Sequence, residues 1–302
     1  MSVTLDIDNY SHVHEKFRHI VSQSDEARLA FLDEPRWVSY DAADALLSTL
    51  DGLMHYPKRP RMPNLLIVGD SNNGKTTIVR RFHQQHASSY TDSDVRSVVP
   101  VLLAEAPTTA SEKGLYINII HRFAVPYRPK DSIDSLRYQA MYLLNEFQVS
   151  MLMIDEFHSM LSGTARQQRQ IMNAIKMLCN ELQIPIIGIG TKDAMRVLHT
   201  DPQHASRFDV FELPVWTLNK EFQKLLYRFE ATLPLKKASQ LHHPELSSQL
   251  HMISEGNLGN LHRLLVQCAK DAITSGEEQI TEKIIKANSW LQPTKGLRHI
   301  MR

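Results

Sequence analysis

The sequence predicts an α/β fold in which a parallel, doubly wound sheet lies between a helical N-terminal extension and a C-terminal helical lid. Three observations predict it. Apolar runs of strand length alternate with helical patterns between residues 65 and 213, a G-x-x-x-x-G-K-T motif follows the first run, and both ends of the chain have helical periodicity only. A length of 302 residues, 42% of them hydrophobic and 22% charged, suits a globular chain of one large or two smaller domains.

The first 60 residues have a helical pattern. Apolar side chains recur at helical spacing over 13–32, and Asp41 is expected to cap a helix over 42–53 that ends before Pro57 and Pro60. Residues 1–60 are therefore predicted to form the N-terminal helical extension.

Strands and helices then alternate through a predicted core domain, residues 61–215. Short apolar runs predict strands, because the strands of a parallel sheet are buried on both faces. Longer segments with apolar residues three and four positions apart predict helices. The expected strands span 65–68, 98–103, 150–154, 185–189 and 209–213, and the expected helices span 74–86, 111–123, 132–147, 165–182 and 192–199.

After Pro214 the pattern is helical only. We expect residues 216–302 to form a small separate domain, a helical lid with a basic tail over 283–302. Its expected helices span 218–232, 244–253, 258–275 and 280–290.

Residues 65–76, Leu-Leu-Ile-Val-Gly-Asp-Ser-Asn-Asn-Gly-Lys-Thr, place a phosphate-binding loop directly behind an apolar strand. Gly69 and Gly74 are expected to let the backbone turn tightly, so that its N–H groups face the phosphates. Lys75 would contact the β- and γ-phosphate oxygens, and the Thr76 hydroxyl would bind Mg²⁺. The motif thus predicts ATP and Mg²⁺ as cofactors, held by Gly69, Asp70, Ser71, Asn72, Asn73, Gly74, Lys75, Thr76 and Thr77.

A second apolar run, residues 151–154, ends in the carboxylates Asp155 and Glu156. We expect Asp155 to hold Mg²⁺ through its water shell and Glu156 to act as the general base for the attacking water. A strand that merely ends in solvated acids is the alternative. With His158 the stretch reads Asp-Glu-Phe-His, as in helicase motifs, but the chain is short for two motor domains and has no second phosphate loop.

Two further positions are typical of phosphate-loop ATPases with an additional strand. Thr191 follows the expected strand over 185–189, where such proteins place a γ-phosphate sensor, although it could simply cap the strand end. Arg207 precedes the last expected strand, at the position of an arginine finger that reaches the γ-phosphate of a neighbouring subunit. It predicts that the active form is a homo-oligomer; an ordinary surface charge is the alternative.

Composition limits the remaining possibilities. The net charge of +1 excludes a globally basic nucleic-acid coat, so any DNA contact must be local, and residues 58–61 form a small basic patch. Cys179 and Cys268 are expected to be unpaired buried thiols, and no residues have the spacing of a structural zinc site. No apolar run is long enough to span a membrane and the start lacks the features of a secretory signal, so we expect a cytoplasmic protein.

Short landmarks along the chain carry a family resemblance. They are Asp155-Glu156-Phe157-His158 with Arg169, Pro185 before Gly188-Ile189-Gly190-Thr191, Asp201-Pro202-Gln203, Ser206-Arg207-Phe208, Leu213-Pro214-x-Trp216, Leu233-Pro234-Leu235, and Ser254-Glu255-Gly256-Asn257-Leu258-Gly259. Over about residues 10–290 the chain resembles TniB, an AAA+ ATPase of transposons, and it is more distantly similar to TnsC and to the B protein of phage Mu. These landmarks are more specific than the nucleotide motifs alone.

The resemblance implies an AAA+ P-loop NTPase that regulates the choice of transposition target. Its ATP-bound form would assemble as a ring or helical filament on double-stranded DNA without sequence specificity, recruit a TniA-like transposase, and dissociate as ATP is hydrolysed. A TniQ-like targeting protein is a further implied partner. The resemblance also implies DNA contacts from the segments after the second core strand, where Lys113 and Lys130 are the candidates; solvated lysines or the basic tail are the alternatives.

The lid departs from the AAA+ pattern at one position. Many AAA+ lids carry a sensor arginine three residues after a glycine, and Gly259 occupies that place here. Arg263, one helical turn further on, is the candidate to reach the nucleotide instead.

Two other classes of function stay open. An AAA+ helicase loader or replication initiator would share the core, although such initiators often append a winged-helix DNA reader for which the chain ends too soon after the lid. A non-catalytic nucleotide switch in signalling would keep the phosphate loop but would not need Glu156.

Overall fold

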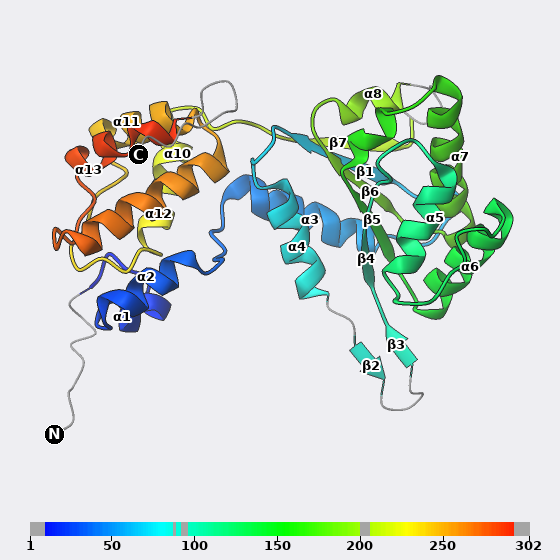
Figure 1. Ribbon diagram of the computed structural model, residues 1–302, viewed down its shortest axis with the longest axis horizontal. Coiled ribbons are helices and arrows are strands. Elements are labelled where there is room, and N and C mark those ends of the chain that lie inside the picture. Colours follow the sequence, from blue (N-terminus) through cyan, green and yellow to red (C-terminus); the bar gives the residue numbers. More distant parts are fainter. Residues whose placement is uncertain (1–9, 87–88, 92–95, 200–205, 293–302) are drawn as a thin grey trace. The chain divides into compact units, whose positions relative to one another are not determined.

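The computed structural model describes residues 10–86, 89–91, 96–199 and 206–292 (Figure 1). It divides into two compact units: a sheet unit, Ala42–Pro214, and a helical unit that joins Met1–Asp41 with Val215–Arg302. This division differs from the three segments expected from the sequence, because the first helices pack with the C-terminal ones. The motif Asp201-Pro202-Gln203 and the tail beyond residue 292 lie outside the described residues.

The sheet unit is built on five parallel strands in the order β4-β5-β6-β1-β7. The fold class predicted from the sequence, an α/β fold with a parallel sheet, is confirmed. Because the strands are parallel, their carboxyl ends lie at one edge of the sheet, and the strand order makes β5, β6 and β1 neighbours there. The strands are β1 (Asn64–Gly69), β4 (Val101–Glu105), β5 (Met151–Asp155), β6 (Ile186–Gly190) and β7 (Phe208–Leu213).

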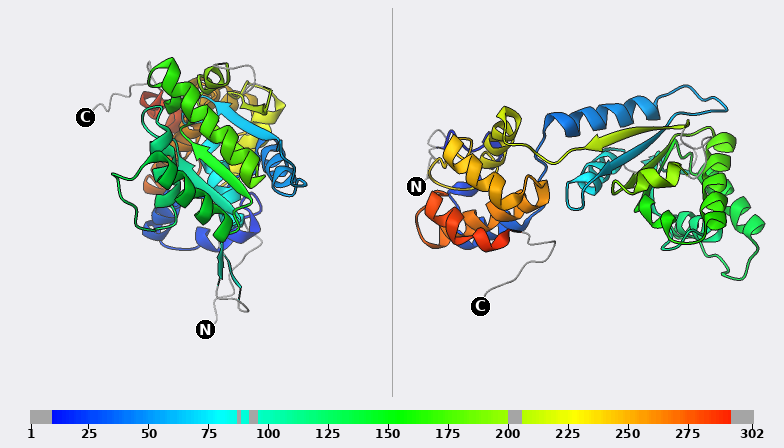
Figure 2. Two further views of the ribbon diagram at one scale, coloured as in Figure 1. Left: turned by 90° about the vertical axis from the view of Figure 1, so that its right-hand side faces the viewer. Right: turned by 90° about the horizontal axis from the view of Figure 1, so that it is seen from above.

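Helices cover both faces of this sheet, and its central strands β1 and β6 are buried along their whole length, whereas the edge strand β7 exposes Asp209 and Glu212. Figures 1 and 2 show α3 and α4 on one face and α5, α6 and α7 on the other. Side chains alternate along each strand, so that Leu66 and Val68 join the core beneath α5 to α7, with Leu152 and Ile154. The helices are α3 (Asp41–Met54), α4 (Lys75–Gln85), α5 (Glu112–His121), α6 (Ile133–Glu146), α7 (Ala165–Leu182) and α8 (Ala194–Leu198), and a 3₁₀ turn, η2 (Phe157–Leu161), follows β5.

The strand expected over 98–103 is wrong as a single element. The structure has a short antiparallel hairpin, β2 (Ser89–Thr91) with β3 (Arg96–Val98), and then β4 from Val101. The break falls at Pro100, which has no N–H to continue a ladder and whose carbonyl accepts from the N–H of Ser150. A hairpin this short has too few residues for a period-two pattern to reveal it.

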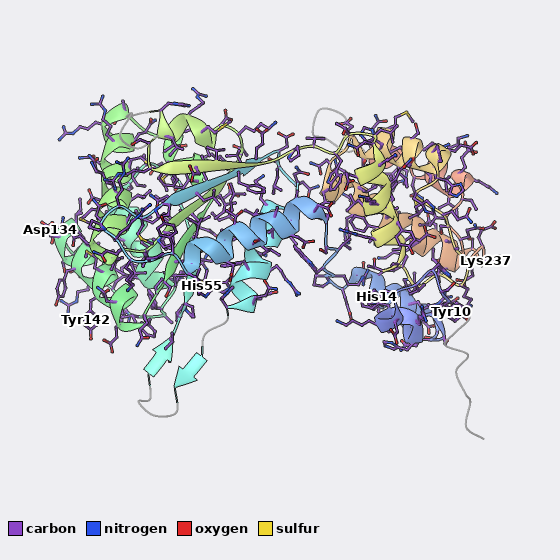
Figure 3. The ribbon with its side chains drawn as sticks, turned by 180° about the vertical axis from the view of Figure 1, so that it is seen from behind. Tyr10, His14, His55, Asp134, Tyr142 and Lys237 are labelled. Atoms are coloured by element: carbon purple, nitrogen blue, oxygen red, sulfur yellow. The ribbon has the colours of Figure 1, made fainter. Side chains whose placement is uncertain are left out.

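The helical unit packs around its longest helix, α12 (Leu258–Thr274), which contacts α2, α11 and α13. Side-chain caps fix the first turn of several of its helices. At the start of α1, the side chain of His14, which is labelled in Figure 3, accepts a hydrogen bond from the backbone N–H of Lys16. The remaining elements are α1 (Glu15–Val21), α2 (Asp25–Asp33), α10 (Lys220–Glu230), α11 (Pro244–Ser254), α13 (Glu282–Ala287) and η3 (Ser289–Leu291).

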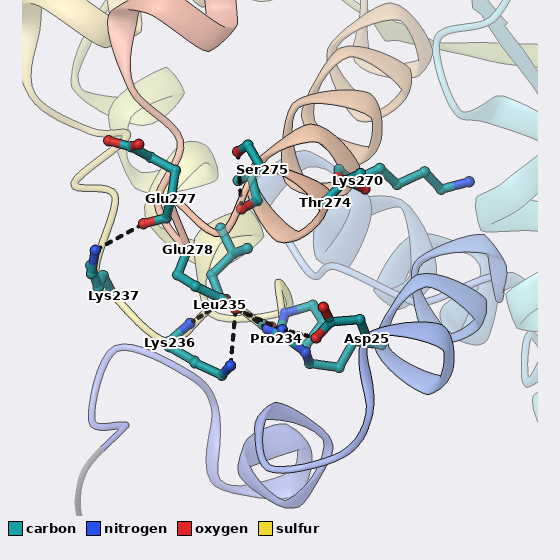
Figure 4. Close-up of polar contacts among 12 residues, drawn as sticks. Asp25, Pro234, Leu235, Lys236, Lys237, Lys270, Thr274, Ser275, Glu277 and Glu278 are labelled. Atoms are coloured by element: carbon teal, nitrogen blue, oxygen red, sulfur yellow. Dashed lines mark hydrogen bonds and ion pairs between the residues drawn. The ribbon is translucent and has the colours of Figure 1, made fainter.

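A buried ion cluster ties α2 to two C-terminal segments (Figure 4). The guanidinium of Arg28, fully buried, donates to both carboxylate oxygens of Glu278 at 2.7 Å and to the carbonyl of Pro234 at 3.1 Å. Lys236 adds a second cation, 3.0 Å from Glu278. Burial would raise the pKa of Glu278, but the hydrogen bonds from Arg28 and Lys236 outweigh it and lower the pKa to about 2. This cluster explains why the N-terminal helices belong with the C-terminal ones.

Candidate functional site

The predicted phosphate loop connects the end of β1 to the start of α4. The loop turns through two residues whose backbone has a left-handed conformation, Asn72 at φ 60° and Gly74 at φ 83°. Gly74 thereby has the conformational role expected of it, since a left-handed φ favours glycine. Gly69 does not have a left-handed φ; instead, a Cβ there would lie 2.8 Å from the carbonyl oxygen of Leu213. Gly69 is needed for the close approach of β7 rather than for a turn.

Lys75 lies folded inside the loop. Its Nζ donates to the carbonyls of Gly69 at 2.8 Å and Asp70 at 2.7 Å, and the residue is buried. Burial lowers the pKa of Lys75, while the carboxylates of Asp155 and Asp70 act in the opposite direction. The carboxylate of Glu156 also acts to raise the pKa of Lys75. A cation in such a loop is suited to phosphate oxygens.

The two sequence motifs meet in space. The hydroxyl of Thr76 donates to Oδ2 of Asp155 at 3.2 Å, although the residues are 79 positions apart. Oδ1 of Asp155 accepts from the backbone N–H of Glu156 at 2.9 Å. A hydroxyl and one carboxylate are the oxygen ligands that Mg²⁺ takes beside phosphate and water. Across the described ranges no group of three His, Cys, Asp or Glu side chains could hold a metal ion, so any metal here would depend on such mixed ligands.

Glu156 stands directly after β5 in a left-handed conformation, with φ 55°. Its side chain is exposed, and its Oε2 lies 3.3 Å from Nε2 of His158. The left-handed backbone is uncommon for a residue with a long side chain, and such conformations concentrate at functional sites.

The remaining residue predicted for the carboxyl edge of the sheet, Thr191, follows β6. Thr191 is partly buried, and its carbonyl accepts from the N–H of Ala194 at the start of α8. The next residue, Lys192, forms an ion pair with Glu212 of β7 at 2.9 Å, which therefore crosses the end of β1. The geometry is compatible with Thr191 as a phosphate sensor and equally with a strand-end cap, so its role stays a prediction.

Arg207 lies at the opposite edge of the sheet. It precedes β7, whose register with β1 pairs Phe208 with Asn64 and Leu213 with Gly69, so about 16 Å of strand separates it from the phosphate loop of its own chain. Its Nη1 donates to Oδ1 of Asn180 on α7 at 2.7 Å. It lines a pocket of about 440 Å³ together with Arg59, Arg61 and other residues that precede β1 and β7.

Three predicted residues lie away from both motifs in the chain. Lys113 is half-buried in the first turn of α5, and Lys130 is exposed in the segment before α6. Arg263 is exposed on α12, in the helical unit. Their expected contacts with DNA and nucleotide stay predictions.

One contact of the phosphate loop was not foreseen from the sequence. The buried side chain of Asn73 donates to the carbonyls of Leu213 at 3.1 Å and Pro214 at 2.9 Å. Asn73 thus holds the loop against the last residues of the sheet unit. Only the loop motif itself marked this residue, because the partner carbonyls are 140 positions away.

Within the described part of the chain, no helix is long and apolar enough to cross a membrane.

The family comparison matches residues 28–218 to the model described as "Bacterial TniB protein". This span is more than half of the chain. No curated protein sequence matches the chain significantly.

Solved structures with a similar fold include nucleotide and DNA complexes. The ORC2 protein of Aeropyrum pernix, in ADPNP–ADP complexes, is 16% identical with a TM-score of 0.56, covering 86% of this chain and 70% of that one. Cdc6p of Pyrobaculum aerophilum is 15% identical, with a TM-score of 0.59 and coverage of 86% and 69%. The Aeropyrum pernix ORC1 protein in complex with DNA is 14% identical, with a TM-score of 0.54 and coverage of 86% and 68%. At these identities the likeness establishes the α/β fold of AAA+ P-loop proteins.

Proposed function

The chain belongs to the TniB family, and from this premise we propose that it is an ATPase that assembles on target DNA and brings a transposase to it. The contact of Thr76 with Asp155, beside Lys75 in the phosphate loop, is the observation that carries the ATPase part. The transposition part rests on family membership. The ADPNP–ADP complexes of an ORC2 protein with the same fold support the choice of nucleotide.

The nucleotide site divides its tasks among few residues. The Lys75 ammonium balances the charge of the β- and γ-phosphates, exchanging its bonds to the loop carbonyls for phosphate oxygens. Thr76 and Asp155 would hold Mg²⁺, which supplies further charge stabilisation at the phosphates. Backbone N–H groups of the loop and of the start of α4 face the same anion.

Hydrolysis needs a base and a positive charge at the transferred phosphate. Glu156 accepts the proton of the attacking water, because it is the exposed carboxylate directly beyond Asp155. Arg207 supplies the charge in trans, because it lies at the far edge of the sheet from its own phosphate loop. The active form is therefore an oligomer, a ring or a helical filament, in which one subunit completes the site of the next.

DNA and protein partners complete the proposal. An ORC1 protein with this fold is solved in complex with DNA, which supports duplex DNA as a ligand of this chain. Lys113 and Lys130 would contact phosphates without reading bases. A TniA-like transposase, with a TniQ-like targeting protein as a further partner, would recognise the ATP-bound assembly.

Glu156→Gln tests the ATPase cycle. The amide cannot accept the proton of water, so turnover should fall at least about a hundredfold while ATP binding is kept and assemblies on DNA persist. Phosphate release and DNA-bound lifetime measure the two effects. Glu146→Gln, an exposed change of the same kind on α6, should leave both unaltered. Turnover within threefold of the parent would remove Glu156 from its role.

A helicase loader or replication initiator is the second candidate, and its support is the likeness to ORC and Cdc6 folds. A transposase that accelerates ATP loss from DNA-bound protein would favour the TniB function. Stimulation by a replicative helicase alone would favour the loader. A non-hydrolysing switch would instead show no turnover that Glu156→Gln could remove.

A further inference from the structure

The carboxylate of Glu156 has an imidazole beside it. Nε2 of His158 lies 3.3 Å from Oε2 of Glu156, and both residues come from the short segment that follows β5. An N–H of a neutral imidazole can donate to such an oxygen without neutralising the carboxylate. Half-exposed pairs of this kind contribute little to stability, so the pair does little for the fold.

The turn that carries His158 is held in place by the glycines of β6. Phe157 is fully buried, and a Cβ added to Gly188 would lie 2.8 Å from its ring. A Cβ at Gly190 would lie 3.2 Å from the backbone N of His158 and 3.4 Å from its Nδ1. Since both glycines allow η2 to lie directly on the strand, the imidazole has a defined position.

Only one of the two ring nitrogens of His158 has a polar contact among the described residues. Among the described residues, Nδ1 of His158 is buried without a hydrogen-bond partner, whereas Nε2 faces Glu156. Glu156 directly follows Asp155, whose carboxylate accepts from Thr76 of the phosphate loop, so His158 contacts a carboxylate beside that loop.

We propose that His158 is a positioning residue for Glu156: its Nε2–H donates to the carboxylate and selects the rotamer in which the base faces the attacking water. This inference rests on the proposed role of Glu156. A glutamate side chain that must be ordered at each turnover loses rotamer entropy, and a misplacement of about 1 Å can cost about 10² in rate.

Donor-free and donor-retaining variants of His158 test the proposal, with ATP turnover measured in the presence of double-stranded DNA. His158→Leu keeps the bulk and removes the donor, so kcat should fall about tenfold or more with KM and ATP affinity within twofold. His158→Gln places an amide N–H at a similar reach and should stay within about threefold of the parent. The matched control is His55→Leu, which removes an imidazole 3.6 Å from the carboxylate of Asp51 on α3 (Figure 3).

A double-mutant cycle separates positioning from a structural role. In the Glu156→Gln background, His158→Leu should cost nothing further, because the residue acts only through the carboxylate. An additional loss there, equal losses in His158→Leu and His158→Gln, or an unchanged kcat in His158→Leu would each overturn the inference. If His158→Leu does not fold, as judged by thermal melting, His158→Ala takes its place under the same criteria.

The outcomes also distinguish this inference from its premise. A Glu156→Gln protein without turnover, together with fully active His158 variants, overturns the positioning role alone. A fully active Glu156→Gln protein overturns the proposed base and the positioning role with it.

Discussion

At the scale of single residues, some contacts of the site join neighbours in the chain, and others join residues that only the sheet brings together. Lys75 is six positions from Gly69 and five from Asp70, so its bonds to their carbonyls are local, whereas Thr76 contacts Asp155 only because β1 and β5 end at the same edge. Arg207 is placed at the other edge, held by Asn180. This position is the reason for the proposal that Arg207 assists phosphate chemistry in a neighbouring subunit.

Arg207 should therefore act in trans. Arg207→Ala and Glu156→Gln subunits, each nearly inactive alone, should regain part of the ATPase activity when mixed, because one of the two kinds of mixed interface combines an intact base with an intact arginine. The measurement is phosphate release across mixing ratios. Arg166→Ala, which removes an exposed arginine from the start of α7, is the control and should not need complementation. Full activity that does not depend on protein concentration would exclude the oligomeric site.

At the scale of elements, the phosphate loop and the end of β1 pack closely against β7. Gly69 lets β1 and β7 approach, and Asn73 donates two hydrogen bonds to the carbonyls at the end of β7 and just beyond. The loop therefore has a fixed partner on its own unit. Its shape depends on a strand far away in the sequence as well as on its own glycines.

Gly69→Ala should destabilise the sheet unit. The new Cβ would lie 2.8 Å from a backbone oxygen, that of Leu213, and only a shift of the strand can relieve this. We expect a loss of about 1–3 kcal/mol in the free energy of unfolding, measured by denaturant titration. Gly52→Ala on α3 is the matched control; nothing lies within 4 Å of its new Cβ, and a gain of about 0.5–1 kcal/mol is expected. Equal stability of the two variants would contradict the packing role of Gly69.

At the scale of the whole molecule, each unit is held together by contacts between residues that are far apart in the chain. The sheet unit does so through its crossed strand order and the helical unit through α2 and the Arg28 to Glu278 cluster. A buried charge that loses its partner is costly, so the helical unit is expected to be sensitive to changes in this cluster.

Glu278→Gln should destabilise the helical unit strongly. It leaves the buried guanidinium of Arg28 without its main counter-charge, and about 3–5 kcal/mol is expected from such a loss. The neighbouring exposed change, Glu277→Gln, should have little effect. Thermal melting followed by circular dichroism measures both, and similar melting temperatures for the two variants would refute the role of the cluster.

The same cluster predicts an acid dependence of stability. The pKa of Glu278 falls from its ordinary 4.5 to about 2 in the folded protein, so the unfolded chain binds the proton first as the pH is lowered. The stabilisation is complete above pH 4.5 and is lost as the pH falls from 4.5 towards 2. The parent should lose more stability across that window than Glu278→Gln, which has no proton to bind at this position.

DNA binding by the assembly should depend steeply on salt. If Lys113 and Lys130 repeat along the oligomer, each contacted phosphate contributes about 0.9 to the log–log slope of affinity against salt, with little dependence on base sequence. Replacing both by Ala should flatten the slope and leave ATP binding intact. Lys237→Ala, which removes one exposed lysine of the helical unit, is the control. An unchanged slope would move the DNA site elsewhere, first to the basic tail.

Much of the fold was predictable because its signals are local. The expected helix over 165–182 matches α7, and the capping pair of Thr164 and Gln167 at its start is visible in the sequence itself. The expected strands 65–68 and 150–154 agree with β1 and β5 within two residues, since buried parallel strands are continuous apolar runs. The hairpin of β2 and β3 was missed because strands of three residues are too short to show an alternation of apolar and polar side chains.

The sequence by itself determined the alternation of strands and helices, the phosphate loop and the acidic pair Asp155 and Glu156, because each depends on residues that are neighbours in the chain. Only the tertiary structure decided that Thr76 contacts Asp155, that Gly69 serves a close approach of β7, and that α2 joins the C-terminal helices through Glu278. Those contacts join residues 79 to 250 positions apart. They follow from the order in which the strands and helices pack, and no local pattern of side chains encodes that order.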